Sequence, residues 1–188
     1  MNVGIYIYER AEELDWAGPW EVLAAWADRA SEVHVFTITD TDGPVRCAKG
    51  LRVLGDHTWE TAPDLDVLVV PGGDSRGPVA NEVLIDRIRT LGARGALLTS
   101  VCTGAFVLQA AGALQNKPAT THWGSMERLG ALGVEVRDER FVDAGDVITA
   151  AGVSAGIDMA LHLVARLDSV ERARDVRRYI QYDPDPPV

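Results

Sequence analysis

Short apolar runs recur along the chain, and they restrict its fold more than any other feature. Each is four to six residues long and rich in Val, Ile or Leu; they span Val3–Tyr8, Val33–Thr37, Val67–Val70, Ala96–Val101 and Val147–Ala150. Most of them lack polar alternation, which is typical of strands that are covered on both faces. We therefore predict a central, mainly parallel β-sheet.

Helical patterns separate these runs, at Pro19–Arg29, Val79–Arg94, Thr103–Ala111 and Ile157–Leu167. We expect Pro19 in the first turn of its helix, where a missing N–H is tolerated. The second helix is expected to have one apolar face made of Val83, Leu84, Ile88 and Leu91. Strands that alternate with helices predict a doubly wound α/β fold with helices on both faces. Shorter segments at 51–54, 134–136 and 140–142 are expected to add a hairpin or an edge.

Length and charge limit the classes of function. The 188 residues suit one domain over residues 1–188, and no run approaches the roughly 20 apolar residues that a membrane span needs. A net charge of −10 argues against nucleic-acid binding. The N-terminus lacks the pattern of a signal peptide, and two cysteines are too few for a disulfide framework. We therefore expect a cytoplasmic protein with free thiols.

Cys102 stands where a buried strand meets an apolar helix. The N-terminus of a helix carries unpaired N–H groups and a positive dipole, which stabilise a thiolate and lower the pKa of a cysteine. The small residues that follow allow a tight turn, as in other nucleophile elbows. Cys102 is therefore a candidate nucleophile. The alternative is that Cys102 is buried as a small apolar residue.

Two further turns follow predicted strands. Gly72 and Gly73 come directly after a strand and Pro71, so their N–H groups are candidate donors to a ligand, or they form an ordinary turn. Asp15 precedes the first helix, where an N-cap role is the common alternative. In a doubly wound sheet all three turns lie at one edge. The sequence therefore predicts a site that contains Asp15, Gly72, Gly73 and Cys102.

Several segments together resemble one superfamily. They are the strand ending in Pro-Gly-Gly, S-V-C-T-G-A at 100–105, A-T-T-H-W at 119–123, A-G-V-S-A-G-I-D at 151–158 and the Y-D-P-D-P-P tail. The chain resembles the DJ-1/PfpI superfamily over essentially its whole length, and within it the bacterial isocyanide hydratases. The resemblance implies a flavodoxin-like fold in which Cys102 is the nucleophile, Asp15 its acidic partner and Thr103 a polar helper. Gly152 and Val153 would line the pocket.

Three positions depart from patterns within that superfamily. Thr103 stands where the protease-like branch has a histidine base, which disfavours peptidase activity. Asp15 replaces the glutamate of the glyoxalase branch, which points away from glyoxal chemistry. Val153 stands in place of an isoleucine, which enlarges the pocket and leaves substrate size open.

The resemblance implies hydration of an isocyanide to an N-substituted formamide through a covalent thioimidate on Cys102. Asp15 and Cys102 would share one proton, with Asp15 as its carrier and the thiol ionised. No cofactor or metal is expected, since the four histidines are scattered. For His122 a pocket role and a structural or dimer-contact role remain equally open.

Other functions are compatible with the same residues. A glyoxalase or deglycase would use Cys102 to attack an aldehyde, and a redox sensor would use its oxidation. A ligand-binding domain of a transcription regulator is disfavoured by the negative charge. Cys47 lies in an expected hairpin and has no elbow. We expect Trp16, Trp20 and Trp123 in the core or an interface, and a homodimer by resemblance only.

Overall fold

The computed structural model describes residues 1–185, and its centre is a sheet of seven strands. The strands are β1 (Asn2–Tyr6), β2 (His34–Thr39), β5 (His57–Thr58), β6 (Val67–Val70), β7 (Leu97–Val101), β10 (Phe141–Asp143) and β11 (Val147–Ala150). Their order is β10-β11-β7-β6-β1-β2-β5. All neighbours are parallel except β10, which runs antiparallel to β11 at the edge. The predicted mainly parallel sheet is confirmed.

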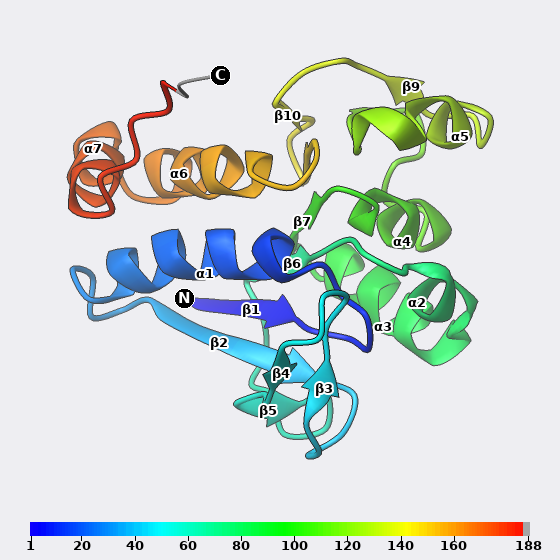
Figure 1. Ribbon diagram of the computed structural model, residues 1–188, viewed down its shortest axis with the longest axis horizontal. Coiled ribbons are helices and arrows are strands. Elements are labelled where there is room, and N and C mark those ends of the chain that lie inside the picture. Colours follow the sequence, from blue (N-terminus) through cyan, green and yellow to red (C-terminus); the bar gives the residue numbers. More distant parts are fainter. Residues whose placement is uncertain (186–188) are drawn as a thin grey trace.

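Helices cover both faces of the sheet (Figure 1). The described helices are α1 (Glu13–Ala27), α2 (Arg76–Ala80), α3 (Glu82–Ala93), α4 (Gly104–Ala110), α5 (Met126–Gly130), α6 (Ala155–Leu167) and α7 (Val170–Tyr179), of which α5 packs against β9 and η1 instead. The crossover from β1 to β2 and that from β6 to β7 lead in opposite directions along the sheet. Because such crossovers are right-handed, α1 and α3 lie on opposite faces. Helices α1, α6 and α7 pack together, and α2, α3 and α4 form a second group.

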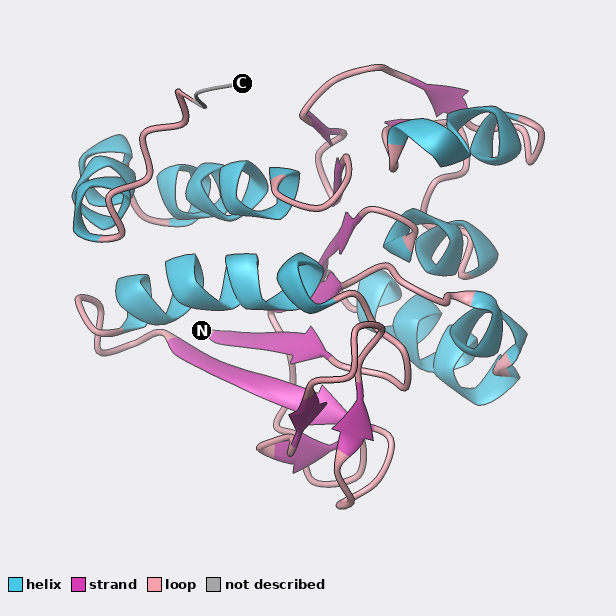
Figure 2. Cartoon of the chain, viewed as in Figure 1, coloured by secondary structure: helices cyan, strands magenta, loops and turns pink. Residues whose placement is uncertain are grey.

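Short elements complete the described chain (Figure 2). β3 (Val45–Arg46) and β4 (Arg52–Val53) form the predicted hairpin, and β8 (Pro118–Ala119) pairs with β9 (Glu135–Val136). The 3-10 turn η1 (Trp123–Ser125) precedes α5. Within residues 1–185 no helix has the length and apolar character needed to cross a bilayer. The last residues of the Y-D-P-D-P-P tail, Pro186 and Pro187, lie outside the described residues.

Two helix predictions were wrong in detail. α1 begins at Glu13, so Pro19 lies in its second turn rather than its first. A Cβ at Gly156 of α6 would lie 3.1 Å from the Pro19 ring, and this close packing holds the proline inside α1. The predicted helix 79–94 is divided at Asn81, whose extended backbone ends α2 and whose Oδ1 caps α3. After that break Val83 is 64% exposed instead of facing the core.

The order of the strands reverses between β1 and β6. In doubly wound sheets, ligands bind at such a reversal, beyond the carboxyl ends of the strands. Four segments begin at this edge of the sheet, close to the reversal, and they follow β1, β6, β7 and β11. Asp15, the Pro-Gly-Gly turn, Cys102 and Gly152 come from these four segments, as the sequence predicts.

Candidate active site

Cys102 occupies a strained elbow between β7 and α4. Its φ of 57° lies in the left-handed region, which is costly for a residue with a side chain. The Cys102 N–H donates to the carbonyl oxygens of Ala150 and Ala151, at 3.0 Å each, and its carbonyl accepts the Thr121 hydroxyl at 2.7 Å. These bonds hold the strained backbone. The side chain is only 7% exposed.

The turn needs glycine two residues after Cys102. A Cβ at Gly104 would lie 2.8 Å from the Pro71 carbonyl oxygen and closer still to that of Val70. The small residue predicted after the elbow is therefore required, because α4 begins in contact with the backbone that leaves β6.

We expect Gly104→Ala to destabilise the protein by about 2–3 kcal/mol, because the methyl group forces α4 away from the β6 backbone. Urea denaturation measures the free energy of unfolding. Gly77→Ala in α2 is the matched control, since nothing lies within 4 Å of its Cβ position. Equal stability of the two variants would contradict the close approach at Gly104.

Asp15 lies in the first turn of α1 and is fully buried beside the Cys102 side chain. Its Oδ2 accepts the Gly72 N–H at 2.8 Å, while no donor within residues 1–185 reaches Oδ1. Burial raises the pKa of Asp15 to about 7, although the Gly72 N–H opposes the rise. A buried carboxyl group with one oxygen uncommitted can accept or release a proton near neutral pH. Asp15 is not the N-cap residue of α1, because that position is taken by Glu12, whose side chain forms no capping hydrogen bond.

The raised pKa of Asp15 predicts a pH-dependent stability. The folded state keeps a proton that the unfolded chain loses above its usual pKa of 3.8, so stability falls as the pH rises from about 4 to 7. Asp15→Asn removes this dependence. Between pH 5 and pH 8, we expect the free energy of unfolding of the variant to rise by about 3 kcal/mol relative to that of the wild type. Urea denaturation at both pH values measures these free energies, with the exposed Asp42→Asn as control. If Asp15→Asn and the wild type differed by the same amount at pH 5 and pH 8, the raised pKa of the buried Asp15 would be contradicted.

The expectation of a lowered thiol pKa was wrong. Burial and the Asp15 carboxylate raise the pKa of Cys102 to about 12, and these effects outweigh the Thr103 N–H at the helix terminus. The raised pKa keeps the Cys102 thiol protonated near neutral pH, and the Asp15 carboxylate is the group placed to accept its proton.

Gly72 and Gly73 differ from the prediction in their role. The Gly72 N–H is taken by Asp15, and the Gly73 N–H donates to the Thr103 hydroxyl at 3.0 Å. The same hydroxyl donates to the Gly73 carbonyl at 3.0 Å. A Cβ at Gly72 would lie 2.7 Å from Asp15 Oδ2. The two N–H groups therefore position Asp15 and Thr103 instead of facing a ligand.

Gly152 and Val153 continue from Ala151, whose carbonyl oxygen accepts the Cys102 N–H. A Cβ at Gly152 would meet the ring of His122, 3.1 Å from its Cγ. The His122 Nδ1 accepts the Gly124 N–H at 3.2 Å and so caps η1. In the structure His122 therefore packs against the loop beside Cys102 and caps η1, and a pocket role for it stays a prediction.

The structure also shows where the other candidate residues of the sequence lie. Cys47 follows β3 as expected, is buried, and has a pKa raised by burial. Trp16 is buried in the core, whereas Trp123 is 79% exposed. Sequence reasoning missed Tyr8 and Thr121, although both lie in segments it had singled out. The available signal was a hydroxyl group in an otherwise apolar run, as at Tyr8, the last residue of the run Val3–Tyr8.

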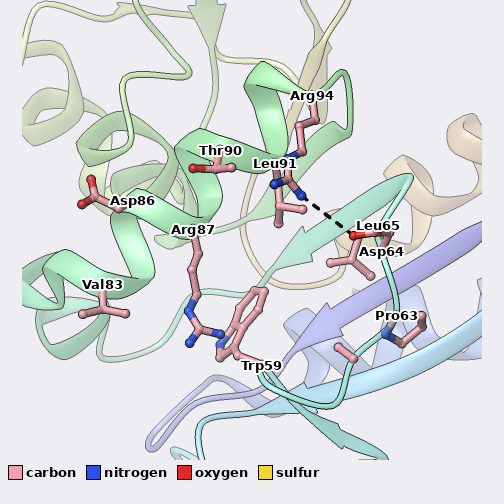
Figure 3. Close-up of a pocket in the computed structure, with 11 residues that line it drawn as sticks. Trp59, Pro63, Asp64, Leu65, Val83, Asp86, Arg87, Thr90, Leu91 and Arg94 are labelled. Atoms are coloured by element: carbon pink, nitrogen blue, oxygen red, sulfur yellow. Dashed lines mark ion pairs between the residues drawn. The ribbon is translucent and has the colours of Figure 1, made fainter.

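A cavity of about 430 Å³ lies away from this site, between α3 and residues 59–65 (Figure 3). Trp59, Leu65 and Leu91 form its apolar wall, and the Arg87 guanidinium lies 6.0 Å from the Trp59 ring centre. Asp15 and Cys102 are not among its lining residues. The cavity and the elbow are therefore separate features.

The fold and the elbow define an α/β protein with a buried cysteine–carboxylate pair. Residues 1–166 match the DJ-1/PfpI family, and the chain belongs to that family. It is 39% identical over 188 residues to the isonitrile hydratase of Pseudomonas putida, covering all of this chain and 81% of the relative.

Two other relatives place the chain within the family. A ThiJ/PfpI family protein from Pseudomonas syringae superposes with a TM-score of 0.92 at 30% identity, covering all of this chain and 77% of the other. A glutathione-independent glyoxalase of Caenorhabditis elegans, DJR-1.2, is 27% identical over 140 residues, 71% of this chain and 73% of the relative. The recognised superfamily and its fold are therefore confirmed.

Proposed function

We propose that this protein is an isocyanide hydratase, which converts R–NC and water into an N-substituted formamide. The observation that carries the proposal is the buried Asp15 carboxyl group, which lies beside Cys102 with its Oδ1 uncommitted. The similarity to an isonitrile hydratase over the full chain supports the choice of substrate class.

The first step joins the sulfur to the terminal carbon of the isocyanide. Asp15 takes the thiol proton as the S–C bond forms, because a thiol with a raised pKa does not ionise by itself near neutral pH. The proton then moves from Asp15 to the same carbon. The product is the thioimidate Cys102–S–CH=N–R, and the carboxylate is restored.

The second step hydrolyses the thioimidate. Asp15 takes a proton from water as its oxygen bonds to the carbon, and returns that proton to nitrogen. The C–S bond then breaks, the remaining hydroxyl proton returns to sulfur, and R–NH–CHO leaves. Thr103, whose hydroxyl is held by the Gly73 N–H and carbonyl, would orient the thiol through its backbone N–H.

A glyoxalase is the second candidate, favoured by the nematode relative. There Cys102 would add to an aldehyde carbon. A redox-sensor role is disfavoured, because oxidation selects exposed thiols of low pKa, whereas Cys102 is buried and its pKa is raised.

One assay separates the two enzymes. Freshly reduced protein is mixed in parallel with an aromatic isocyanide and with methylglyoxal, and formamide absorbance and aldehyde loss are followed. We expect formamide to form and the aldehyde to persist. Consumption of methylglyoxal alone would favour the glyoxalase. The homodimer, the cytoplasmic compartment and the single domain over residues 1–188 stay predictions from the sequence.

A further inference from the structure

One buried peptide group joins a tyrosine to the candidate active site. The Tyr8 hydroxyl donates to the Pro71 carbonyl oxygen at 3.0 Å, and the Gly72 N–H donates to Asp15 Oδ2 at 2.8 Å. This carbonyl and this N–H belong to the same peptide group. Three polar groups therefore form a continuous chain from Tyr8 to Asp15.

We propose that Tyr8 is a positioning residue that sets the proton affinity of Asp15 through the Pro71–Gly72 peptide group. A donor on a peptide carbonyl polarises the group and makes its N–H a stronger donor, so hydrogen bonds in a chain reinforce one another. A stronger Gly72 N–H stabilises the Asp15 carboxylate. The functional meaning of this effect rests on the proposed function, in which Asp15 is the base for Cys102.

The surroundings of Tyr8 suit this role. Tyr8 lies two residues beyond β1 and is 2% exposed, and its hydroxyl lies within the electrostatic influence of Asp15 and Cys102. Burial raises the pKa of its hydroxyl well above the usual value, so the hydroxyl stays protonated and remains a donor.

Other groups also act on Asp15. Besides the Gly72 N–H, Glu12 raises its pKa, while Lys49 and Cys102 lower it. Each is left in place when the Tyr8 hydroxyl is removed. The effect of that removal on Asp15 therefore reports the loss of the Tyr8 hydroxyl, whose hydrogen bond goes to the Pro71 carbonyl.

The test measures the rate of Cys102 alkylation by iodoacetamide across pH, with peptide mass spectrometry to separate Cys102 from Cys47. In the wild type we expect an inflection due to Asp15, and Asp15→Asn should abolish it. Tyr8→Phe should move this inflection upward by about half a pH unit, because the carboxylate loses stabilisation.

Tyr6→Phe is the matched control. Tyr6 is also a buried tyrosine of the first apolar run, but its hydroxyl bonds to Asp40 at 3.0 Å instead of to the Pro-Gly-Gly turn. We expect Tyr6→Phe to leave the inflection unchanged. An unchanged inflection in Tyr8→Phe, or an equal shift in both variants, would overturn the proposal.

A second substitution tests the proposal even if Tyr8→Phe folds poorly. Replacing Tyr8 by 3,5-difluorotyrosine keeps the hydroxyl and makes it a stronger donor, so the inflection should move downward. No downward shift would count against the proposal. Alkylation needs no isocyanide, so hydratase activity can fail while the Tyr8 effect is upheld. A profile without any Asp15-dependent inflection would overturn both the Tyr8 effect and the role of Asp15 in the proposed mechanism.

Discussion

Cys102→Ser should lose at least about a thousandfold in the rate of formamide formation, since it removes the group that forms the covalent intermediate. A serine hydroxyl is a far weaker nucleophile than a thiol, and Asp15, with a pKa of about 7, is too weak a base to ionise it. Steady-state rates with an aromatic isocyanide measure the loss. The effect should appear in kcat, because the substitution changes the reacting atom and leaves the side chain nearly the same size.

Cys47→Ser is the matched control for that experiment. Cys47 is the other buried cysteine, and it lies after β3, in a hairpin with no elbow. We expect it to retain wild-type turnover. Similar losses in both variants would point to a general effect on folding, and full turnover in Cys102→Ser would exclude a thioimidate at this residue.

Asp15→Asn should slow formamide formation by about a hundredfold to ten-thousandfold, the usual contribution of a positioned acid–base group. Asparagine keeps the shape of the side chain and can accept the Gly72 N–H, but it cannot take the thiol proton. With the raised pKa of Cys102, little thiolate then forms near neutral pH.

The pH profile gives this prediction a second readout. In the wild type the rate should rise with pH as Asp15 ionises, around its raised pKa of about 7. In Asp15→Asn this rise should disappear, whereas the exposed Asp42→Asn should keep it. A wild-type profile in Asp15→Asn would show that another group is the base.

The sheet could be predicted because its signal is local. Runs such as Val67–Val70 are apolar on both faces, which is typical of a parallel strand that is covered on both faces. The position of the site follows from the same reasoning. Parallel strands end at one edge, so Asp15 after β1 and Cys102 after β7 were expected there, on either side of the turn that follows β6.

The electrostatics of the site could not be predicted in the same way. The thiol pKa depends on how fully Cys102 is buried and on a carboxylate 87 positions away in the chain, Asp15. The helix terminus alone suggests that the pKa of the thiol is lowered. The targets of the Gly72 and Gly73 N–H groups are likewise set by the tertiary turn, and the sequence shows only that glycine is present.

Two helices also departed from the simple helical pattern, for different reasons. Pro19 normally marks the start of a helix, yet here it lies inside α1 against Gly156 of α6. Val83 fits a helical apolar face, but the break at Asn81 turns it outward. The first departure depends on a contact between α1 and α6, whereas the second comes from the local Asn81 cap on Leu84.

The most direct test of the account uses the wild-type protein alone. Cys102 is alkylated in steps, the modified fraction is measured from its peptide, and residual formamide formation is plotted against that fraction. We predict a straight line that reaches zero activity when Cys102 is fully alkylated, with protection by the isocyanide. Activity that persists in fully alkylated protein, or the absence of formamide formation before alkylation, would contradict hydration at Cys102.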